Sequence, residues 1–416
     1  ETGENVKAAF DDIFEQLYKL NEEEILGQKE KMNILTLNKI AACGTDLFDK
    51  SRYTVGDAVE NPTGILVRSA KMHDMQFGDN LLAIARAGAG VNNIPVERCA
   101  QEGICVFNTP GANSNAVKEL AVCALLLASR KIVEAASWAA SLKGTPDAPK
   151  TVEGGKSKFA GPEIAGKTLG IIGLGAIGGK IANAAEALGM KVIGYDPYIS
   201  IGAALHLDPT VKIVSDINDI YANSDYITIH MPYTPQTKNT IDAEQIAMMK
   251  DGVRLINLAR GELINSEAVV KAIADGKVAK YVTDFADDVV LGVENVIVLP
   301  HLGASTPESE DNCAVMAAEE LIEYLENGNI KNSVNLPNAS MNAVGTKICI
   351  IHKNVPTTIA SITTAVGNEG LNIENMVNAS KKDFAYTMLD IIGDVPPTVE
   401  GKINAVDGVI RVRIIK

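Results

Sequence analysis

The chain has 416 residues, a length typical of two to three domains that can each bury a substantial core. Its 46% hydrophobic and 22% charged residues exclude a mainly disordered, collagenous or membrane-embedded chain. With 38 Lys and Arg against 52 Asp and Glu, the net charge is −14, which disfavours nucleic acid or an anionic membrane as a partner.

The first 31 residues differ in character from the rest of the chain. They are acidic and place Phe10, Ile13, Phe14 and Leu17 at helical spacing, which predicts one amphipathic helix. Met32 then opens an apolar strand, so we interpret residues 1–31 as an appended segment. The alternative is a genuine N-terminal helix that packs on the core or on a partner, and deleting the segment tests this.

Short apolar strands alternate with helices from Met32 to about residue 131. Strands are expected at 32–37, 64–67 and 82–85, and a helix at 115–130. Such alternation predicts an open parallel sheet covered by helices. Residues 141–166, rich in Gly, Pro and Lys, are expected to form an irregular connection.

A second α/β region comes next and resembles a doubly wound fold. It is expected to hold six strands, at 168–172, 191–195, 226–230, 253–258, 281–284 and 296–299. After a helix at about 308–327 and a linker at 335–340, the tail has the order strand, helix, strand, strand, helix, strand.

The spacing of the cysteines matches neither a redox motif nor a metal-binding motif. They are scattered, with no C-x-x-C pair and no histidine at zinc spacing, which indicates buried reduced thiols and no metal site. No apolar run of about 20 residues and no signal-peptide pattern is found, so a soluble cytoplasmic protein is expected. The six are Cys43, Cys99, Cys105, Cys123, Cys313 and Cys349.

A dinucleotide-binding fingerprint lies at the junction between the strand at 168–172 and a helix. In Gly173-Leu174-Gly175-Ala176-Ile177-Gly178, the first glycine permits a tight turn, the second lets the backbone approach a pyrophosphate, and the third allows close packing of helix on strand. The helix start then offers free N–H groups to the phosphates. Asp196 ends the next strand and is expected to bind the ribose diol, which favours NAD over NADP.

Several further motifs complete a family signature. His230-Met231-Pro232, Asn257 to Gly261 and Pro300 to Thr306 follow the glycine fingerprint and Asp196 in order. Together these motifs resemble the NAD-dependent D-2-hydroxyacid dehydrogenase family over about residues 32–337. The resemblance implies a substrate domain of residues 32–131 and 308–337, an inserted NAD-binding domain of residues 132–307, and a site in the cleft between the two.

Two residues carry the expected catalysis. Arg260 follows a buried strand, where an unpaired charge is costly, and its planar fork suits the carboxylate and carbonyl of a 2-hydroxy or 2-keto acid. His301 is the expected general acid/base, because histidine exchanges protons near neutral pH. A surface arginine and a structural histidine are the plainer alternatives.

The family pairs this histidine with a glutamate, which the chain lacks at that place. The sequence has Asp284-Phe285-Ala286-Asp287-Asp288, so Asp288 or, failing it, Asp287 is the candidate orienting carboxylate, and exposed loop acids are the alternative. Asp284 matches the family's aspartate that holds the nicotinamide carboxamide. The other expected NAD contacts are His230, Pro232, Thr237, Ala259, His301 and Gly303.

The remaining substrate contacts are expected mainly from the first domain. A Gly-rich loop offers backbone N–H groups to a carboxylate, and basic side chains follow two strands. Asn115 has a second interpretation as a helix N-cap. Lys39, just past the first strand, is expected to reach an outer phosphate together with Arg68, and a solvated surface lysine is the alternative. The substrate-binding residues implied by the resemblance are Arg68, Ser69, Ala89, Gly90 and Asn115.

The tail of residues 343–416 resembles an ACT regulatory domain, a module that binds small amino acids, usually across a dimer interface. Dehydrogenases of this family with such a tail oxidise 3-phosphoglycerate to 3-phosphohydroxypyruvate for L-serine synthesis. The resemblance therefore implies 3-phosphoglycerate as substrate, L-serine as inhibitor, and a homodimer or homotetramer. His352, Asn354 and Asn372 match serine-contacting positions, with turn-forming asparagines as the alternative.

Two rival functions stay open. One is another D-2-hydroxyacid dehydrogenase, which acts on glycerate or lactate. The other is a non-catalytic NAD sensor on the same fold. Arg260 and His301 disfavour the sensor, and the missing glutamate favours it slightly.

Overall fold

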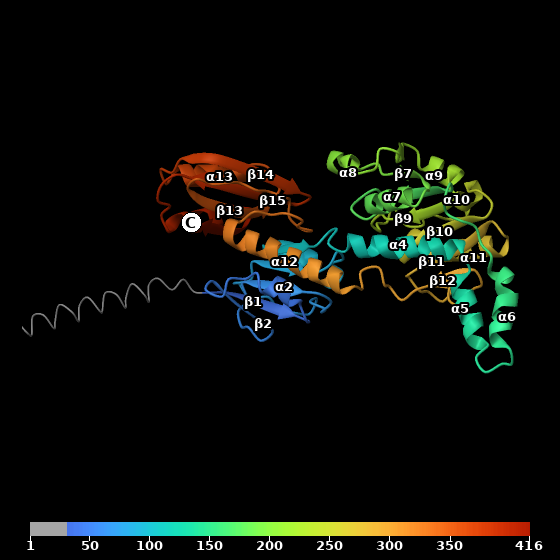
Figure 1. Cartoon of the computed structure of the whole chain (residues 1–416). Coiled ribbons are helices and arrows are strands. Elements are labelled where there is room, and N and C mark those ends of the chain that lie inside the picture. Colours follow the sequence, from blue (N-terminus) through green and yellow to red (C-terminus); the bar gives the residue numbers. More distant parts are fainter. Residues whose placement is uncertain (1–30) are drawn as a thin grey trace, which may run out of the picture. The chain divides into compact units, whose positions relative to one another are not determined.

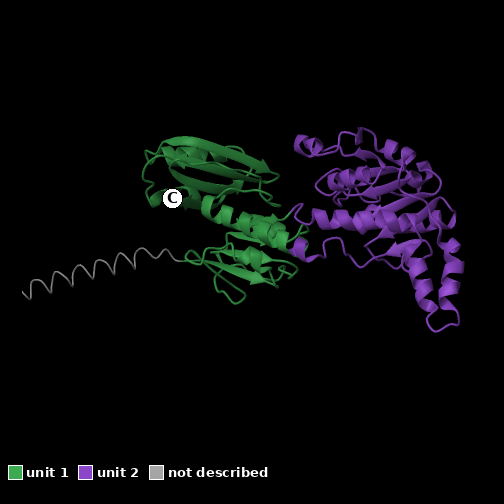
Figure 2. Ribbon diagram, viewed as in Figure 1, with its two compact units in different colours: residues 1–109, 311–416 green, residues 110–310 purple. Residues whose placement is uncertain are grey.

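The computed structural model describes residues 31–416, which form two compact units (Figure 1; Figure 2). Unit 1 comprises the chain up to Thr109 together with Asp311–Lys416, and unit 2 comprises Pro110–Glu310. The helix predicted for residues 1–31 lies outside the described residues, apart from Lys31.

Unit 1 contains a five-stranded parallel sheet of order β2-β1-β3-β4-β5. The register aligns the last residues of four strands, Leu37, Val67, Arg86 and Asn108, so the loops that follow them leave the same edge. The predicted strands at 32–37 and 64–67 are confirmed, and that at 82–85 is shifted by one residue. The elements are β1 (Met32–Leu37), α2 (Ala42–Thr45), β2 (Tyr53–Gly56), β3 (Gly64–Val67), β4 (Ala83–Arg86), α3 (Val96–Gln101) and β5 (Cys105–Asn108).

The tail forms a four-stranded antiparallel sheet of order β14-β15-β13-β16, and its predicted strand–helix–strand–strand–helix–strand order is confirmed. Residues alternate between its two faces, as expected for strands. Ile348 and Ile350 pack with the two helices of the tail, whereas Cys349 and Ile351 enter the core of the first sheet. The elements are β13 (Thr346–Lys353), α13 (Thr358–Gly367), β14 (Ile373–Lys381), β15 (Phe384–Ile391), α14 (Thr398–Asn404) and β16 (Val409–Ile415).

This shared core fixes the tail to the rest of unit 1. The guanidinium of Arg413 donates to the carbonyl oxygens of Tyr324 and Leu325 at 3.2 and 2.8 Å, and its charge lies 4.6 Å from the centre of the Tyr324 ring. The Tyr386 hydroxyl donates to the Gly328 oxygen at 2.7 Å. Tyr324 belongs to α12 (Pro307–Asn327), so the tail packs as part of unit 1 rather than as a tethered module.

Unit 2 is built on a seven-stranded parallel sheet of order β12-β11-β10-β9-β6-β7-β8. All six predicted strands are present, with ends that shift by up to three residues. The seventh, β8, was not predicted, because two of its three residues are exposed and give no apolar signal. The strands are β6 (Thr168–Ile172), β7 (Lys191–Tyr195), β8 (Lys212–Val214), β9 (Tyr226–Ile229), β10 (Val253–Asn257), β11 (Val278–Thr283) and β12 (Val296–Val298).

The predicted helix at 115–130 is α4 (Ser114–Ser129), and it packs in the core of unit 2. Ala121 and Leu125 of α4 share a cluster with Leu169 of β6 and Ile181 of α7. Unit 2 therefore begins before this helix, at Pro110, whereas the sequence placed the boundary at 131/132. The other helices are α5 (Ile132–Ser141), α6 (Ala148–Gly155), η1 (Lys156–Phe159), α7 (Gly178–Ala187), α8 (Ile201–Leu205), α9 (Ile217–Asn223), α10 (Ala243–Met248), η2 (Gly261–Leu263) and α11 (Ser266–Ala274).

The irregular connection expected at 141–166 is wrong, because α6 and η1 lie within it. Pro149 sits in the first turn of α6, where its missing N–H costs no hydrogen bond. The Trp138 ring packs on Phe159, with ring centres 5.2 Å apart, and a Cβ on Gly155 would lie 2.2 Å from Trp138. The glycine that suggested a loop thus serves the close contact of a helix with Trp138.

All six cysteines in the described chain are free. Four are buried as predicted, but Cys43 and Cys123 are exposed. No helix within residues 31–416 is long and apolar enough to span a bilayer.

Glu320 on α12 is buried and gives unit 1 a pH-dependent stability. Its Oε1 accepts from Asn332 Nδ2 at 2.6 Å, its Oε2 has no partner among the described residues, and burial raises the pKa of Glu320 to about 8. From about pH 4.5 to pH 8 the folded chain holds a proton that the unfolded chain releases, so the free energy of unfolding falls as pH rises.

We expect Glu320→Gln to remove much of this fall and to raise the free energy of unfolding at pH 8 by about 2 kcal/mol. Urea denaturation at pH 6 and pH 8 measures it. The control is Glu319→Gln, at the exposed neighbouring position. An unchanged pH dependence in Glu320→Gln would contradict the expectation.

Candidate active site of unit 2

The turn from β6 into α7 has the geometry that its glycines predict. Gly173 has φ of +95°, and a Cβ there would lie 2.4 Å from the His230 carbonyl oxygen. A Cβ on Gly178 would lie 1.9 Å from the Gly173 oxygen. At Gly175, by contrast, an added Cβ meets no described atom within 4 Å. The first and third glycines thus form the turn, and the second faces open space where a pyrophosphate fits.

This turn lies where the order of the sheet reverses. β6 pairs with β7 on one side and β9 on the other, and ligands of doubly wound folds bind at this switch point. Asp196 follows β7, and its carboxylate accepts from the backbone N–H groups of Leu174 and Tyr198, both at 2.9 Å. The predicted ribose-binding carboxylate is therefore held against the glycine turn.

Two buried polar atoms on residues that directly follow β9 and β11 have no hydrogen-bond partner among the described residues. His230 Nε2 bonds Thr228 Oγ1 at 2.7 Å, but its Nδ1 is unpaired, and burial lowers the pKa of His230 to about 3. Asp284 Oδ2 accepts from the Gly303 N–H at 3.1 Å, while its Oδ1 is unpaired. Buried polar groups are normally bonded, so these atoms fit a polar ligand such as the nicotinamide carboxamide.

The other predicted NAD contacts lie on the loops that follow these strands. The Thr237 hydroxyl donates to the Pro232 oxygen at 2.9 Å and closes the loop after β9. Ala259 donates its N–H to Asn257 Oδ1 at 3.2 Å. Within the glycine turn, Ala176 is exposed and Ile177 is half-buried.

Arg260 and His301 both act electrostatically on the Asp284 carboxyl, which is 2% exposed. Burial raises the pKa of Asp284, and the charges of His301 and Arg260 oppose that rise. The side chains of Arg260 and His301 are themselves exposed. The structure thus brings together the two predicted catalytic residues and the aspartate that ends β11.

The backbone around His301 and Arg260 is held by specific bonds. His301 has φ of +32°, its N–H donates to the Asp284 and Leu299 oxygens, and its ring lies 4.8 Å from that of Phe285. The side chain of fully buried Asn257 donates to the Arg260 oxygen at 2.8 Å. Sequence reasoning missed Asn257 as a support of this turn, although its place at a buried strand end was a signal.

Neither alternative carboxylate for His301 is paired with it. Asp287 accepts from the Ser266 hydroxyl at 2.5 Å and from the N–H groups of Val289 and Val290, so it stabilises a turn. Asp288 makes no hydrogen bond or ion pair within residues 31–416. The carboxyl that interacts with His301 is Asp284.

In unit 2 the sequence also missed a link between α4 and α7. Lys180 Nζ donates to Ser114 Oγ at 2.6 Å, which ties the start of α4 to the nucleotide helix. Asn115 lies in the first turn of α4 and donates to Glu119 Oε1 at 2.9 Å. Its interpretation as the N-cap is wrong, because Asn113 occupies that position.

Unit 1 carries the other predicted substrate residues along one edge of its sheet. Asn38, with φ of +72°, accepts from the N–H groups of Ser69 and Ala70 at 2.9 and 2.7 Å, and so fixes the loop after Arg68. Lys39 follows Asn38, and Arg86 Nε donates to the Arg68 oxygen at 3.0 Å. Three basic side chains therefore leave neighbouring strand ends.

The Gly-rich loop after β4 is braced by the end of β5. Asn108 Nδ2 donates to the Ala89 oxygen at 2.6 Å, and the Thr109 N–H donates to the Gly88 oxygen at 3.2 Å. Ala89 and Gly90 are the predicted carboxylate-binding residues of this loop. The bracing residues Asn38 and Asn108 were not predicted, because their partners are distant in the sequence.

The three residues predicted to bind serine are not brought together within one chain. His352 is 2% exposed, and both ring nitrogens are bonded, to the Lys353 oxygen and Thr387 Oγ1, each at 2.8 Å. Asn354 follows β13 and Asn372 precedes β14. These strands run in the same direction, so the two asparagines lie at opposite ends of the sheet, roughly 25 Å apart for strands of this length.

Comparison with known proteins agrees with the geometry of unit 2. Residues 122–303 match the family model described as D-isomer specific 2-hydroxyacid dehydrogenase, NAD binding domain. A hydroxypyruvate reductase from Thermotoga maritima is 39% identical over 262 residues, which cover 60% of this chain and 80% of the reductase. The chain belongs to the D-isomer specific 2-hydroxyacid dehydrogenase family.

Other members of the family match as well. A D-3-phosphoglycerate dehydrogenase from Methanocaldococcus jannaschii is 40% identical over 277 residues, covering 65% of this chain and 51% of that enzyme. The chain thus spans about half the length of the first phosphoglycerate dehydrogenases that it matches. Among solved structures, NAD+-bound 3-phosphoglycerate dehydrogenase from Entamoeba histolytica is 27% identical, with a TM-score of 0.58 over 75% of this chain and 100% of that one.

Within residues 31–416 no three His, Cys, Asp or Glu side chains lie together as metal ligands would. The candidate site of unit 2 comprises the glycine turn, Arg260, His301 and the buried Asp284. These residues lie within the part of the chain that matches the NAD-binding domain of the family.

Proposed function

We propose that this chain oxidises 3-phosphoglycerate to 3-phosphohydroxypyruvate with NAD. The observation that carries the proposal is the grouping of Arg260 and His301 around the buried Asp284, on the sheet that bears the glycine turn. Relatives named D-3-phosphoglycerate dehydrogenase support the choice of substrate.

The residues divide the chemistry among them. Bound NAD supplies the hydride acceptor for C2 of the substrate. Arg260 holds the carboxylate and stabilises the carbonyl oxygen that forms, because its planar guanidinium donates two parallel bonds. His301 takes the proton of the C2 hydroxyl as general base. Within unit 1, Lys39, Arg68 and the N–H groups of Ala89 and Gly90 are candidate groups for a phosphate or a carboxylate.

The deciding measurement is NADH formation, followed optically, with 3-phosphoglycerate, D-glycerate and D-lactate in turn. If 3-phosphoglycerate is the only one of the three acids that is turned over, the proposal is supported, because the other two acids lack the phosphate. Faster turnover of glycerate or lactate makes the chain another dehydrogenase of the family. Binding of NAD without turnover of any of these acids favours the non-catalytic NAD sensor.

Asp284 and Asp288 compete for the role of orienting His301. We favour Asp284, because the His301 N–H donates to its backbone oxygen at 3.0 Å and the charge of His301 acts on its carboxyl. We expect Asp284→Asn to lower kcat at least about tenfold and to shift the acid limb of the pH–rate profile to lower pH, because the imidazolium loses a neighbouring negative charge. Asp287→Asn and Asp288→Asn are the matched controls. If the acid limb of the pH–rate profile shifts in Asp288→Asn and not in Asp284→Asn, then Asp288 rather than Asp284 orients His301.

We also propose that L-serine inhibits through the C-terminal sheet. Because Asn354 and Asn372 lie at opposite ends of that sheet, a site that uses both takes one from each of two chains. This fits the predicted homodimer or homotetramer. Titration with L-serine, with rate and melting temperature as readouts, tests the proposal, and no change in either refutes it.

A further inference from the structure

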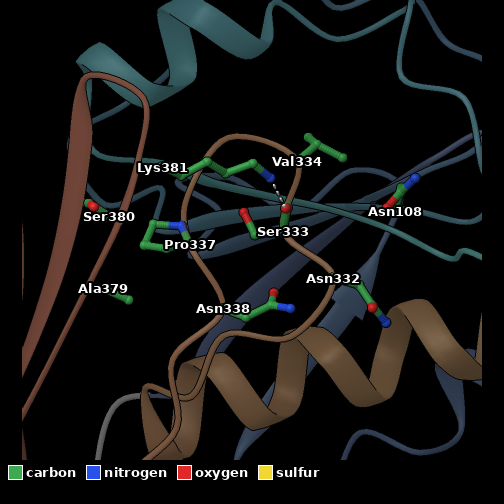
Figure 3. A pocket seen from close by; sticks show the side chains of 9 residues that line it. All are labelled: Asn108, Asn332, Ser333, Val334, Pro337, Asn338, Ala379, Ser380 and Lys381. Carbon is green, nitrogen blue, oxygen red and sulfur yellow. Dashed lines mark hydrogen bonds between the residues drawn. The ribbon is translucent and has the colours of Figure 1, made fainter. Parts of the chain in front are cut away.

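A hollow of about 590 Å³ in unit 1 has no part in the function proposed above. Figure 3 shows its walls, which come from three segments distant in the sequence. One is the end of β5, one is the segment that follows α12, and one is the end of β14. The lining residues are Asn108, Asn332, Ser333, Val334, Pro337, Asn338, Ala379, Ser380 and Lys381.

The lining has a distinct chemistry. Among its members, three asparagines and two serines offer both hydrogen-bond donors and acceptors, and Lys381 supplies the positive charge. No carboxylate side chain lines the hollow. Asn332 donates to the buried Glu320, and burial raises the pKa of Glu320 to about 8, so this side chain adds little negative charge at neutral pH. Such a surface suits a small anion that also carries hydroxyl or ammonium groups.

The walls are held in place before any ligand arrives. Lys381 Nζ donates to the Ser333 oxygen at 2.8 Å, a bond drawn in Figure 3, and keeps two further protons for a ligand. Ser333 is 6% exposed, and its hydroxyl lies 3.1 Å from both the Val106 oxygen and Asn335 Oδ1. Asn332 is fixed by its bond to Glu320. A preformed polar site loses less entropy on binding than a flexible one.

We propose that this hollow binds a small polar carboxylate, an amino or hydroxy acid, with the carboxylate at Lys381 and the polar substituents at the asparagine side chains. The volume lies within the range of ligand sites and exceeds a single small acid, so water shares the space.

The hollow also reaches the predicted substrate loop through one residue. Asn108 lines the hollow, and its Nδ2 donates to the Ala89 oxygen at 2.6 Å. A ligand that engages the Asn108 side chain therefore competes with or strengthens that bond. Since coupling between two sites is reciprocal, the bound acid changes the affinity for substrate. This second step rests on the proposed function, whereas binding itself does not.

Calorimetric titration of the full chain with L-serine, L-lactate and inorganic phosphate tests the binding. We expect one of the two carboxylates to bind at one site per chain that Asn372→Ala leaves intact. Asn338→Asp is expected to weaken binding at this site at least about tenfold, because the variant adds a negative charge to an exposed lining position. Lys381→Gln is expected to weaken it likewise. Lys382→Gln, at the exposed next residue, is the control and leaves binding unchanged.

Phosphate binding without carboxylate binding overturns the proposal, and so does the absence of any binding. Carboxylate binding that survives Asn338→Asp but is lost in Asn372→Ala overturns it too, because the acid then occupies the predicted serine site. For the coupling, KM for 3-phosphoglycerate is expected to change at least about twofold at saturating acid in the wild type and not in Asn338→Asp. An unmoved KM overturns the coupling and leaves the binding result standing.

Discussion

His301→Gln is expected to lower kcat for 3-phosphoglycerate oxidation by about 10²- to 10⁴-fold, the usual contribution of a general base. Glutamine retains a polar group of similar reach but cannot take up a proton. The backbone at this position has φ of +32° and is held by bonds to Asp284 and Leu299, so the exposed side chain can change with little effect on the fold.

The melting temperature is therefore expected to change little in His301→Gln. His206→Gln, an exposed histidine of the same unit, is the matched control and retains full activity. Stopped-flow measurement of NADH formation separates the chemical step from product release. A burst of unchanged rate in His301→Gln would show that another group takes the proton.

The nucleotide turn could be predicted from the sequence because its signals are local. Gly173, Gly175 and Gly178 stand within six residues. A Cβ on Gly178 would meet the Gly173 oxygen, a Cβ on Gly173 would meet the His230 oxygen, and Gly175 faces open space. The sheet of unit 2 could be predicted for the same reason, since buried parallel strands form continuous apolar runs. The exposed β8 gave no such run and was missed.

Asp284, the carboxyl that we propose orients His301, is brought to it by the tertiary fold and could not be predicted in this way. Asp284 stands seventeen positions before His301, and the two meet because β11 and β12 end side by side in the sheet. The family pattern directed attention to the loop acids Asp287 and Asp288 instead. Likewise, the hydrogen bond from Asn108 to the Ala89 oxygen joins the ends of neighbouring strands, so the spacing of these residues along the chain does not predict it.

The secondary structure of the C-terminal tail could be predicted from the sequence, but its packing could not. The predicted order of strands and helices along the tail is confirmed. The sequence did not predict that Cys349, Ile351 and Tyr386 enter the core of the first sheet. An apolar strand face shows that it is buried, but not which element covers it. Nor did the sequence show that Asn354 and Asn372 lie at opposite ends of the C-terminal sheet.

Three neighbouring glycines allow a test that separates the fold from NAD binding. Gly178→Ala is expected to destabilise the chain by about 3 kcal/mol and to abolish measurable NAD binding, because the new Cβ would lie 1.9 Å from the backbone oxygen of Gly173. Backbone atoms cannot rotate away as a side chain can. The start of α7 must therefore move off β6, and the N–H groups that face the phosphates move with it.

Gly179→Ala, one residue further, is the matched control. Its Cβ would lie 3.5 Å from Leu207 Cδ2, which is an ordinary contact, and alanine in place of glycine inside a helix stabilises by up to about 1 kcal/mol. NAD affinity is expected to stay unchanged. A loss of stability in both variants would mean that the helix, rather than the close approach at Gly178, is sensitive to substitution.

Gly175→Ala separates ligand from fold. No described atom lies within 4 Å of the added Cβ, so the melting temperature is expected to stay within about 2 °C of the wild type. A pyrophosphate in the space before Gly175 would meet the new methyl group, and we expect the Kd for NAD to rise at least about tenfold. Calorimetric titration with NAD measures this directly. An unchanged Kd in a stable Gly175→Ala protein would place the pyrophosphate elsewhere and refute the assignment of this turn.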